Sequence, residues 1–368
     1  MKIIDYTYDI ENAQFANDTF KELYEIDYDK ILYFDIETTG LSSRNSTLYL
    51  IGVLSYEKDK LHLRQWFNND GYSEKELITS FDDYCSYYSC LIHFNGITFD
   101  IPYIRDKAAR HNITLNNIND MKQVDIFKEI RSYKKLFGLD NMKQTTIEDY
   151  IGIKREDTYT GGELINVYQR YVARPDKERE HLLLLHNHDD VIGLTKLLPI
   201  LNYKLLFEEA DIISHKLSYD DNNLTMEITL NEHLLLPKRI TGTNKQGIYI
   251  NASDNSLIII IPLINDNLKH FFKDYKNYYF LPKENMAVHK SVAAYVDSDN
   301  REPATKTSCY VTKTDLYIIC PDKEYKDCFS KEYGDMITYR TLSSLINDTT
   351  KNQVLYITNI LKSYKKNI

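Results

Sequence analysis

The first third of the chain contains apolar runs with the length and composition of β-strands. Residues 31–36 are apolar, aromatic and β-branched, and residues 48–56 form a second apolar run. Residues 61–67 alternate between apolar and polar side chains. Runs of this kind, separated by turn residues, are typical of strands. We therefore predict that the fold opens with three antiparallel strands.

Helical periodicity then alternates with short apolar segments. Ser73 precedes apolar residues at positions 77, 78, 81 and 84, the spacing of one helix face with an N-cap before it. The segments that follow are predicted as a strand at 90–94, a helix at about 100–111, a short strand around 124–127 and helices up to about Tyr203. Early strands and late helices are typical of an α/β domain with a mixed sheet flanked by helices.

The pattern becomes β-rich after Tyr203. Strand-like segments lie at 224–230, 247–251, 257–261, 291–296, 309–311 and 316–320, followed by a helix at about 354–364. A chain of 368 residues is also longer than one hydrophobic core usually organises. We therefore predict an α/β domain over residues 1–204 and a smaller β-rich accessory domain, of unknown role, over residues 205–368.

Composition narrows the class of protein. The hydrophobic fraction of 43% comes without a run of about 18 apolar residues, so we expect no membrane span. The first residues lack the apolar core of a signal peptide, and we expect a cytoplasmic protein. The five cysteines form no Cys-x-x-Cys pair, which argues against a zinc ribbon or a disulfide framework. Free, mostly buried thiols are the prediction.

The net charge of -9 at first argues against a nucleic-acid partner. Basic and acidic residues are balanced in residues 201–368, however, so the negative surplus lies in the first 200 residues. A cluster of metal-binding carboxylates contributes to such a surplus, and bound cations would reverse the local field. The 31 tyrosines are better explained by overall composition than by base stacking.

The clearest candidate site begins with the segment DIETTGL at 35–41. Asp35 and Glu37 end an apolar strand, and the two-residue period of a strand points both carboxylates to one face, where they can share a hard cation. The turn that follows allows close backbone approach by a terminal nucleotide. The candidate substrate-binding residues at this turn are Thr38, Thr39, Gly40 and Leu41.

A second motif, FNGITFD, occupies residues 94–100. A predicted strand ends at Asn95, and Asp100 begins the next helix, with a plain N-cap as the alternative role for its carboxylate. Asn95 and Phe99 are further candidate substrate-binding residues. The alternatives are that Asn95 only supports the loop and that Phe99 only packs.

A third motif, HNHDDV, lies at 186–191 within a long helical stretch. His186 and Asp190 are one helical turn apart, so they share a face and can reach one small site. Asp189 is the alternative to Asp190 as the acidic ligand, but it lies about 100° away around the helix. His188 lacks a partner at that spacing and is expected to be exposed or structural.

Together, the three segments resemble the three exonuclease motifs of the DEDD superfamily, which includes polymerase proofreading domains. They are most similar to the YprB-type ribonuclease-H-like family of bacteria, and the resemblance covers roughly residues 30–202. It implies a ribonuclease-H-like fold and a 3′-to-5′ exonuclease acting on an end of single-stranded DNA or RNA. It also implies that Asp35, Glu37, Asp100 and Asp190 hold two Mg²⁺ or Mn²⁺ ions.

By the same resemblance, His186 handles the nucleophilic water. Its position departs from both common patterns, because histidine-type members place the His five residues before the last Asp and tyrosine-type members place a Tyr four before. An imidazole can accept or orient a proton near neutral pH, and two cations can neutralise and activate a phosphodiester. The five residues Asp35, Glu37, Asp100, His186 and Asp190 are thus the predicted catalytic set.

Other functions and contacts stay open at this stage. A non-catalytic nucleic-acid-binding or assembly module and a structure-selective endonuclease are the alternative functions. Lys134, Lys135 and Lys143 could contact phosphates or simply be solvated. Asp125 is expected to have a structural role. Protein partners, the choice between DNA and RNA, and the role of residues 205–368 are not determined by the sequence.

Overall fold

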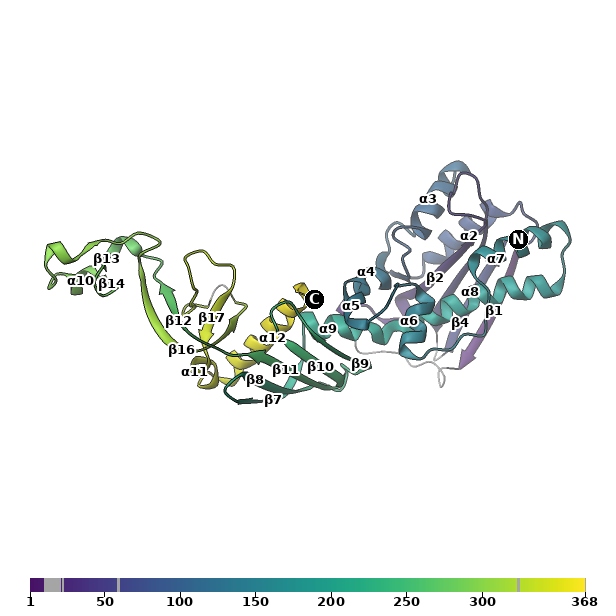
Figure 1. The fold of residues 1–368 in the computed structure, drawn as a ribbon. Helices are drawn as coiled ribbons and strands as arrows, with labels where there is room; N and C mark the ends of the chain where they lie inside the picture. Colours follow the sequence, from purple (N-terminus) through teal and green to yellow (C-terminus); the bar gives the residue numbers. More distant parts are fainter. Residues whose placement is uncertain (10–20, 22, 58–59, 323–324, 368) are drawn as a thin grey trace. The chain divides into compact units, whose positions relative to one another are not determined.

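A six-stranded mixed sheet forms the centre of the first part of the computed structural model (Figure 1). Its strand order is β1-β4-β3-β2-β5-β6. The strands are β1 (Lys2–Asp9), β2 (Ile31–Thr38), β3 (Leu48–Glu57), β4 (Lys60–Phe67), β5 (Cys90–His93) and β6 (Lys122–Asp125). Strands β2, β3 and β4 form the predicted antiparallel meander, and β5 and β6 add to it in parallel. The edge strand β1 was not predicted and pairs with β4.

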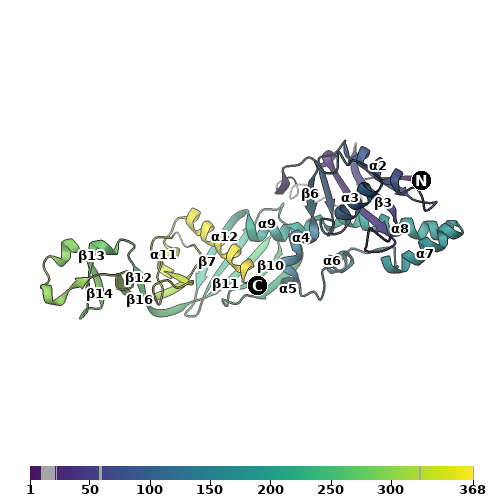
Figure 2. The ribbon, with the colours of Figure 1, turned by 90° about the horizontal axis from the view of Figure 1, so that it is seen from above.

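The helices of this part and of the segment that follows it are α2 (Glu74–Cys85), α3 (Asp100–Arg110), α4 (Ile126–Ile130), α5 (Lys134–Phe137), α6 (Gln144–Ile151), α7 (Gly161–Ala173), α8 (Lys177–Leu197) and α9 (Asn202–Glu208). Helices α2 and α3 cover one face, and α7 and α8 cover the other (Figure 2). The predicted α/β architecture, with a mixed sheet between helices, is confirmed.

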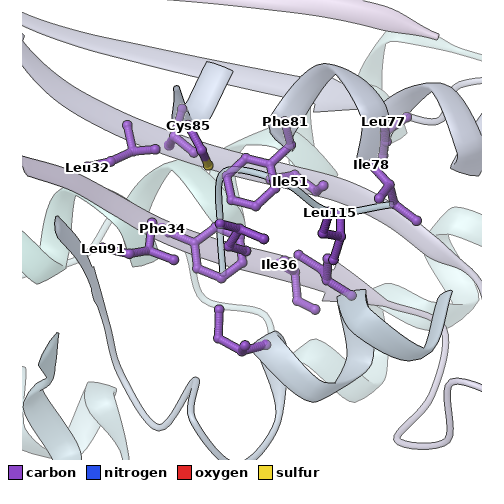
Figure 3. Close-up of a cluster of buried hydrophobic side chains, with 14 of the residues drawn as sticks. Leu32, Phe34, Ile36, Ile51, Leu77, Ile78, Phe81, Cys85, Leu91 and Leu115 are labelled. Carbon is purple, nitrogen blue, oxygen red and sulfur yellow. The ribbon is translucent and has the colours of Figure 1, made fainter. Parts of the chain in front are cut away.

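The alternation of side chains along β2 divides them between these two helical layers. Leu32, Phe34 and Ile36 are buried against α2 and α3, where Phe34 stacks on Phe81 with ring centroids 4.9 Å apart (Figure 3). Full burial of each such side chain stabilises the fold by roughly 1.5–3 kcal/mol. Residues 33, 35 and 37 therefore face the opposite layer, which contains α8. This packing determines which side of the sheet carries the two acidic residues of β2.

The described residues of the second part of the chain form three smaller sheets. One has the strand order β7-β8-β11-β10-β9, the second β12-β16-β17 and the third β14-β13-β15. The strands are β7 (Ile212–Tyr219), β8 (Asn223–Leu230), β9 (Leu236–Thr243), β10 (Tyr249–Asp254), β11 (Ser256–Pro262), β12 (Ile264–Phe271), β13 (Tyr278–Leu281), β14 (Met286–His289), β15 (Glu302–Pro303), β16 (Tyr310–Cys320) and β17 (Thr338–Thr341). The helices are α10 (Lys290–Ala293), α11 (Leu342–Ile346) and α12 (Thr350–Lys366). The predicted β-rich character is confirmed.

One strand prediction in this part was wrong. Residues 290–293 form the short helix α10, although the apolar run 291–296 was predicted as a strand. Short apolar runs do not distinguish a strand from one turn of helix by periodicity alone. The strand predictions at 309–311 and 316–320 are confirmed except at Cys309. Both segments belong to the single long strand β16, because the polar residues between them continue its pairing with β12.

The chain divides into two compact units. The N-terminal unit contains residues 1–205 together with 233–238, and the C-terminal unit contains 206–232 and 239–368. The structure describes residues 1–9, 21, 23–57, 60–322 and 325–367. Among these residues no helix has the length and apolar character needed to cross a membrane. The five cysteines are free, and only Cys328 is not fully buried.

Candidate metal centre

The two acidic residues of β2 point toward α8. Asp35 and Glu37 alternate with Ile36, whose side chain is buried in the opposite core. The pairing of β2 with β3 shifts register between Glu37 and Thr38, which ends the regular ladder at this point. The first motif thus ends a buried strand, as the sequence predicted.

The other two carboxylates come from helices. Asp100 is the first residue of α3 and is buried, so it is a helix-start residue but not the N-cap, which is Phe99. Asp190 lies inside α8 and is half-buried. All four carboxylates line one groove, whose wall also contains Phe94, Asn95 and His186.

His186 lies beside two of these carboxylates. Its Nε2 is 3.6 Å from Glu37 Oε1 and 3.5 Å from Asp190 Oδ2. Its Nδ1 is 2.6 Å from Asp157 Oδ2, a partner that the sequence did not suggest. The ring therefore has one nitrogen toward the acidic cluster and the other toward a loop carboxylate.

A buried amide holds Asp35 in place. Asn187 Nδ2 donates to Asp35 Oδ2 at 2.9 Å, and Asn187 Oδ1 accepts from Gln65 Nε2 at 2.9 Å. Asn187 fits here because Gly52 opposes Asp35 on β3, and a Cβ at Gly52 would lie 1.9 Å from Asn187 Oδ1. Sequence reasoning missed Asn187, although a glycine inside an apolar strand is a signal for close approach.

Asp190 is held by an arginine. Arg155 Nη2 donates to Asp190 Oδ1 at 2.6 Å, and its Nη1 donates to the buried Glu148 at 3.1 Å. Gln144 Nε2 joins them by donating to Glu148 Oε1 and to the Asp190 carbonyl, both at 2.8 Å. One carboxylate oxygen of Asp190 is thereby fixed, and the other faces His186.

Asp189, the alternative acidic residue, has other partners. Its Oδ2 accepts from the backbone N–H groups of Glu156 at 2.9 Å and Asp157 at 2.8 Å. Its Oδ1 is 3.0 Å from His188 Nδ1, and His188 Nε2 is 2.7 Å from the Tyr8 hydroxyl. Asp189 and His188 therefore hold a loop and the edge strand, which is a structural role.

Burial and repulsion between neighbouring charges raise the pKa values of Asp35, Glu37 and Asp100. Burial and then the charge of Asp190 hold the pKa of Asp35 well above its usual range. Burial raises the pKa of Glu37 to about 8, although the neighbouring His186 opposes that rise. Burial raises the pKa of Asp100 to about 7, against hydrogen bonds from the backbone of Asp100 and Ile36. The folded protein therefore holds these groups in an environment that disfavours negative charge.

The pKa of His186 is shifted in the opposite sense to that expected for a buried histidine. Burial favours the neutral ring, but Glu37, Asp190 and Asp157 outweigh it and raise the pKa above the ordinary value. Several acidic groups and one imidazole thus share a small volume.

The donor set of this cluster fits a divalent cation. Glu37, His186 and Asp190 each offer a ligand atom within 4.8 Å of the other two, and the carboxylates of Asp35 and Asp100 line the same groove. Hard cations such as Mg²⁺ or Mn²⁺ prefer carboxylate oxygens. Positive charge placed here would also relieve the repulsion that raises the pKa values of Asp35 and Glu37.

The predicted turn residues have different surroundings. The Thr38 hydroxyl donates to the Gly40 carbonyl at 3.0 Å, and Thr39 Oγ1 accepts from the Thr47 N–H at 2.8 Å. These contacts close the turn. Leu41 is 88% exposed and lines the groove, so it alone of the four presents a large free side chain.

The second motif forms a loop tied to Asp125. Asn95 has a positive φ of 63°, and its N–H donates to Asp125 Oδ1 at 2.8 Å. Asp125 also accepts from Ile97 N–H at 3.2 Å, which agrees with its expected structural role. Phe99 is partly buried beside Tyr103 and also lines the groove.

The groove continues beyond the carboxylates toward α6. Its continuation is lined by Phe94, Asn95, Phe127, Met142, Lys143 and Gln144, together with Asp35 and Asp190. Of the three predicted basic residues, Lys143 lies on this lining and Lys134 and Lys135 do not. A cation at the groove wall is a suitable contact for a phosphate.

Comparison with known proteins gives a family match for the first part of the chain. Residues 32–202 match the family model RNase_H_2, described as RNase_H superfamily. No curated protein sequence matches the chain. The matched segment contains all four carboxylates, His186 and the strands from β2 to β6.

Several solved structures are also similar. The family B DNA polymerase from the hyperthermophilic archaeon Pyrobaculum calidifontis has 12% identity and a TM-score of 0.41, over 91% of this chain and 46% of the polymerase. Exonuclease I of E. coli in complex with a dA16 oligonucleotide has 10% identity and a TM-score of 0.28, over 54% of each chain. The chain spans about half the length of these proteins. The family match and the mixed sheet between two helical layers show that residues 32–202 have a ribonuclease-H-like fold.

Proposed function

We propose that the protein is a divalent-metal-dependent nuclease of the DEDD type, most similar to the YprB-type family, that hydrolyses single-stranded DNA or RNA from the 3′ end. The observation that carries this proposal is the convergence of four carboxylates and one imidazole on one groove, with His186 Nε2 within 3.6 Å of Glu37 and 3.5 Å of Asp190. Acidic clusters of this size are costly to bury, which indicates a function beyond stability.

The roles follow from the chemistry of each group. Asp35, Glu37, Asp100 and Asp190 would hold two Mg²⁺ or Mn²⁺ ions. When bound, such ions neutralise the phosphate, favour a deprotonated water and stabilise the leaving oxyanion. His186 Nε2 lies at the edge of the acidic cluster, where it can accept or orient the proton of the attacking water.

The groove offers positions for the substrate on either side of this cluster. Leu41 and Phe99 present apolar surface beside the carboxylates, and Lys143 lies farther along the groove wall. Apolar side chains can contact a base, and a lysine can contact a phosphate. A single strand can follow such a groove without base-specific hydrogen bonds, so the proposed substrate class is single-stranded nucleic acid.

The test is hydrolysis by the purified full-length chain. Linear 3′-labelled and 5′-labelled DNA and RNA oligonucleotides are incubated with Mg²⁺ or Mn²⁺, with EDTA as the metal-free arm, beside circular single strands. Release of mononucleotides from linear substrates only is expected. Cleavage of circles would instead indicate an endonuclease, and metal-independent or absent hydrolysis would overturn the proposal.

Two matched variants distinguish the loss of a proposed metal ligand from the general effect of removing one negative charge. Asp35→Asn removes one proposed ligand, whereas Glu178→Gln removes an exposed carboxylate from the first turn of α8. Only Asp35→Asn should abolish hydrolysis. Equal activity of both purified variants would contradict the assigned site.

A further inference from the structure

The loop between α6 and α7 contacts three side chains of α8. Within this loop, residues 155–157 make hydrogen bonds to His186, Asp189 and Asp190. Arg155 binds Asp190, and Asp157 binds His186. Asp189 accepts from the backbone N–H groups of residues 156 and 157. One short loop thus reaches both the proposed general base and its neighbouring carboxylate.

Asp157 is the closest partner of His186. Its Oδ2 is 2.6 Å from His186 Nδ1, and its side chain is 3% exposed. A carboxylate at this distance accepts a hydrogen bond from a protonated Nδ1. The other ring nitrogen, Nε2, then faces Glu37 and Asp190. In the neutral ring of this tautomer Nε2 is the acceptor, which is the form that a general base requires.

The position of Asp157 is itself fixed. Asp189 Oδ2 holds the Asp157 N–H at 2.8 Å, and Asp157 Oδ1 accepts from the Tyr159 N–H at 3.0 Å. Both carboxylate oxygens are therefore in use, one on the loop and one on the imidazole. Neither oxygen of Asp157 lines the groove of the acidic cluster.

We propose that Asp157 is a positioning residue that fixes the orientation and tautomer of His186, so that Nδ1 carries the hydrogen and Nε2 is presented to the reacting groups. This inference rests on the proposed nuclease function for its catalytic consequence. The hydrogen bond itself does not depend on that function. Partners of this kind, one step removed from a metal site, typically change activity by 10–100-fold when they are replaced.

The substitution Asp157→Asn makes a specific prediction about the ring. The Tyr159 N–H still requires an acceptor, so the amide oxygen should take the place of Oδ1 and the amide nitrogen should face His186. An amide N–H against Nδ1 favours the tautomer with its hydrogen on Nε2. The acceptor that faces Glu37 and Asp190 is then lost, while the shape of the side chain is preserved.

The first measurement is proton NMR of the full-length, metal-free protein. An imidazole Nδ1–H bonded to a buried carboxylate gives a strongly downfield resonance whether the ring is neutral or charged, and His186→Gln identifies it by its loss. The resonance should be present in the wild type and absent in Asp157→Asn. Asp157→Ser, which removes the carboxylate but can still accept from Tyr159, is the second variant should the first fail to fold. Persistence of the resonance without the carboxylate would overturn the proposal.

The second measurement is kinetic. Asp157→Asn should lower kcat by roughly 10–100-fold with little change in KM, and should cause no further loss when added to His186→Ala. The control is Asp82→Asn, since Asp82 is also a buried, loop-holding carboxylate but binds the backbone of residues 116–118. Full additivity of the double variant, or an equal fall in kcat for Asp82→Asn, would overturn the role.

The NMR and kinetic measurements distinguish failure of the positioning role from failure of the proposed nuclease function. If the wild type hydrolyses no nucleic acid, the proposed nuclease function fails, and the NMR comparison alone decides whether Asp157 fixes the ring. If hydrolysis is present but the resonance is missing from the wild type, the positioning role fails and the nuclease function stands.

Discussion

The two units differ in where they bury ionisable groups. Among the described residues, the N-terminal unit fully buries the charged side chains of Glu37, Glu74, Asp82, Asp100, Lys107, Asp125 and Glu148. In the described part of the C-terminal unit, Arg340 is the only charged side chain buried to this degree, and it pairs with Asp348 at 3.0 Å. Strands β8 and β11 of this unit alternate between buried and more exposed side chains, as expected of sheets with one buried face.

The buried acidic residues of the N-terminal unit fall into two kinds, which differ in whether their surroundings stabilise the negative charge. Several buried acids of the N-terminal unit are satisfied by backbone N–H groups, as Asp82 and Asp125 are, and these hold loops. Asp35 and Glu37 instead repel neighbouring carboxylates, which raises their pKa values. A protein selected only for stability would not gather such groups. Function is the better explanation for those carboxylates, and structure for the others.

The largest expected effect is loss of hydrolysis without loss of the fold. Asp35→Asn should abolish activity because one proposed ligand is removed. It should also raise the thermal midpoint of the metal-free protein, because it removes a repelled carboxylate while Asn187 can still donate to the new amide oxygen. Calorimetry in EDTA and hydrolysis in Mg²⁺ measure the two effects.

Asp100→Asn provides a second version of the same test. Its carboxylate lies on a different element, α3, and its pKa is also raised by burial. Wild-type activity in either folded variant would show that the carboxylates do not form the reacting site.

His186→Ala comes next in expected size. Turnover should fall by roughly 100-fold or more, the usual contribution of a general base, with Mn²⁺ affinity little changed. His186→Tyr should keep measurable activity above that of His186→Ala if the proposed function holds, because a tyrosine four residues before the last Asp is the pattern of tyrosine-type DEDD exonucleases. Calorimetric Mn²⁺ binding and single-turnover rates report the two effects separately. Equal weakening of metal binding by His186→Ala and Asp190→Ala would make His186 a ligand.

The members of the acidic cluster could be named from the sequence because each has a local signal and because the three motifs together resemble those of the DEDD superfamily. Asp35 and Glu37 end an apolar strand, and the spacing of His186 and Asp190 is one helical turn. The surrounding partners could not, since nothing local distinguishes Asp157 or Arg155 from other charged loop residues. Their roles arise only when the loop after α6 packs on α8.

For the fold as well, elements with a local sequence pattern were predicted, and features that depend on contacts far apart in sequence were not. The meander and the order of helices follow from periodicity, and they were predicted. Strand β1 was missed because it completes the sheet through pairing with β4, which is far away in sequence. The six-residue segment His233–Lys238 was assigned by sequence to the second domain, yet it clusters with the N-terminal unit in the structure.

A truncation tests how independent the N-terminal unit is. A fragment of residues 1–204 should fold and bind Mn²⁺, since the carboxylates and His186 all lie within it. It should be less stable than the same unit in the full chain, because the Asn202 amide and the buried Tyr203 hydroxyl lose their acceptors, the carbonyls of Leu235 and Lys238. Each lost hydrogen bond to a buried group costs about 1–3 kcal/mol. Failure of the fragment to fold under any condition would show that the proposed boundary near residue 204 cuts a shared core.

The smallest expected effect is a dependence of metal-free stability on pH. Burial raises the pKa of Glu37 from 4.5 to about 8 and that of Asp100 from 3.8 to about 7, so the folded state binds more protons than the unfolded state between these limits. The free energy of unfolding should therefore fall as pH rises from about 4 to about 8. The raised pKa of His186 acts in the same direction, because its proton also binds more tightly in the folded state.

Urea unfolding in EDTA at several pH values measures this fall, which Glu37→Gln should flatten and the exposed control Glu178→Gln should not. Saturating Mn²⁺ should reverse the trend, since a bound cation favours the ionised carboxylates. A stability that rises with pH over this range in EDTA, or that follows the same curve in the wild type and Glu37→Gln, would mean that the cluster is already neutralised by Arg155 and His186 without a metal ion.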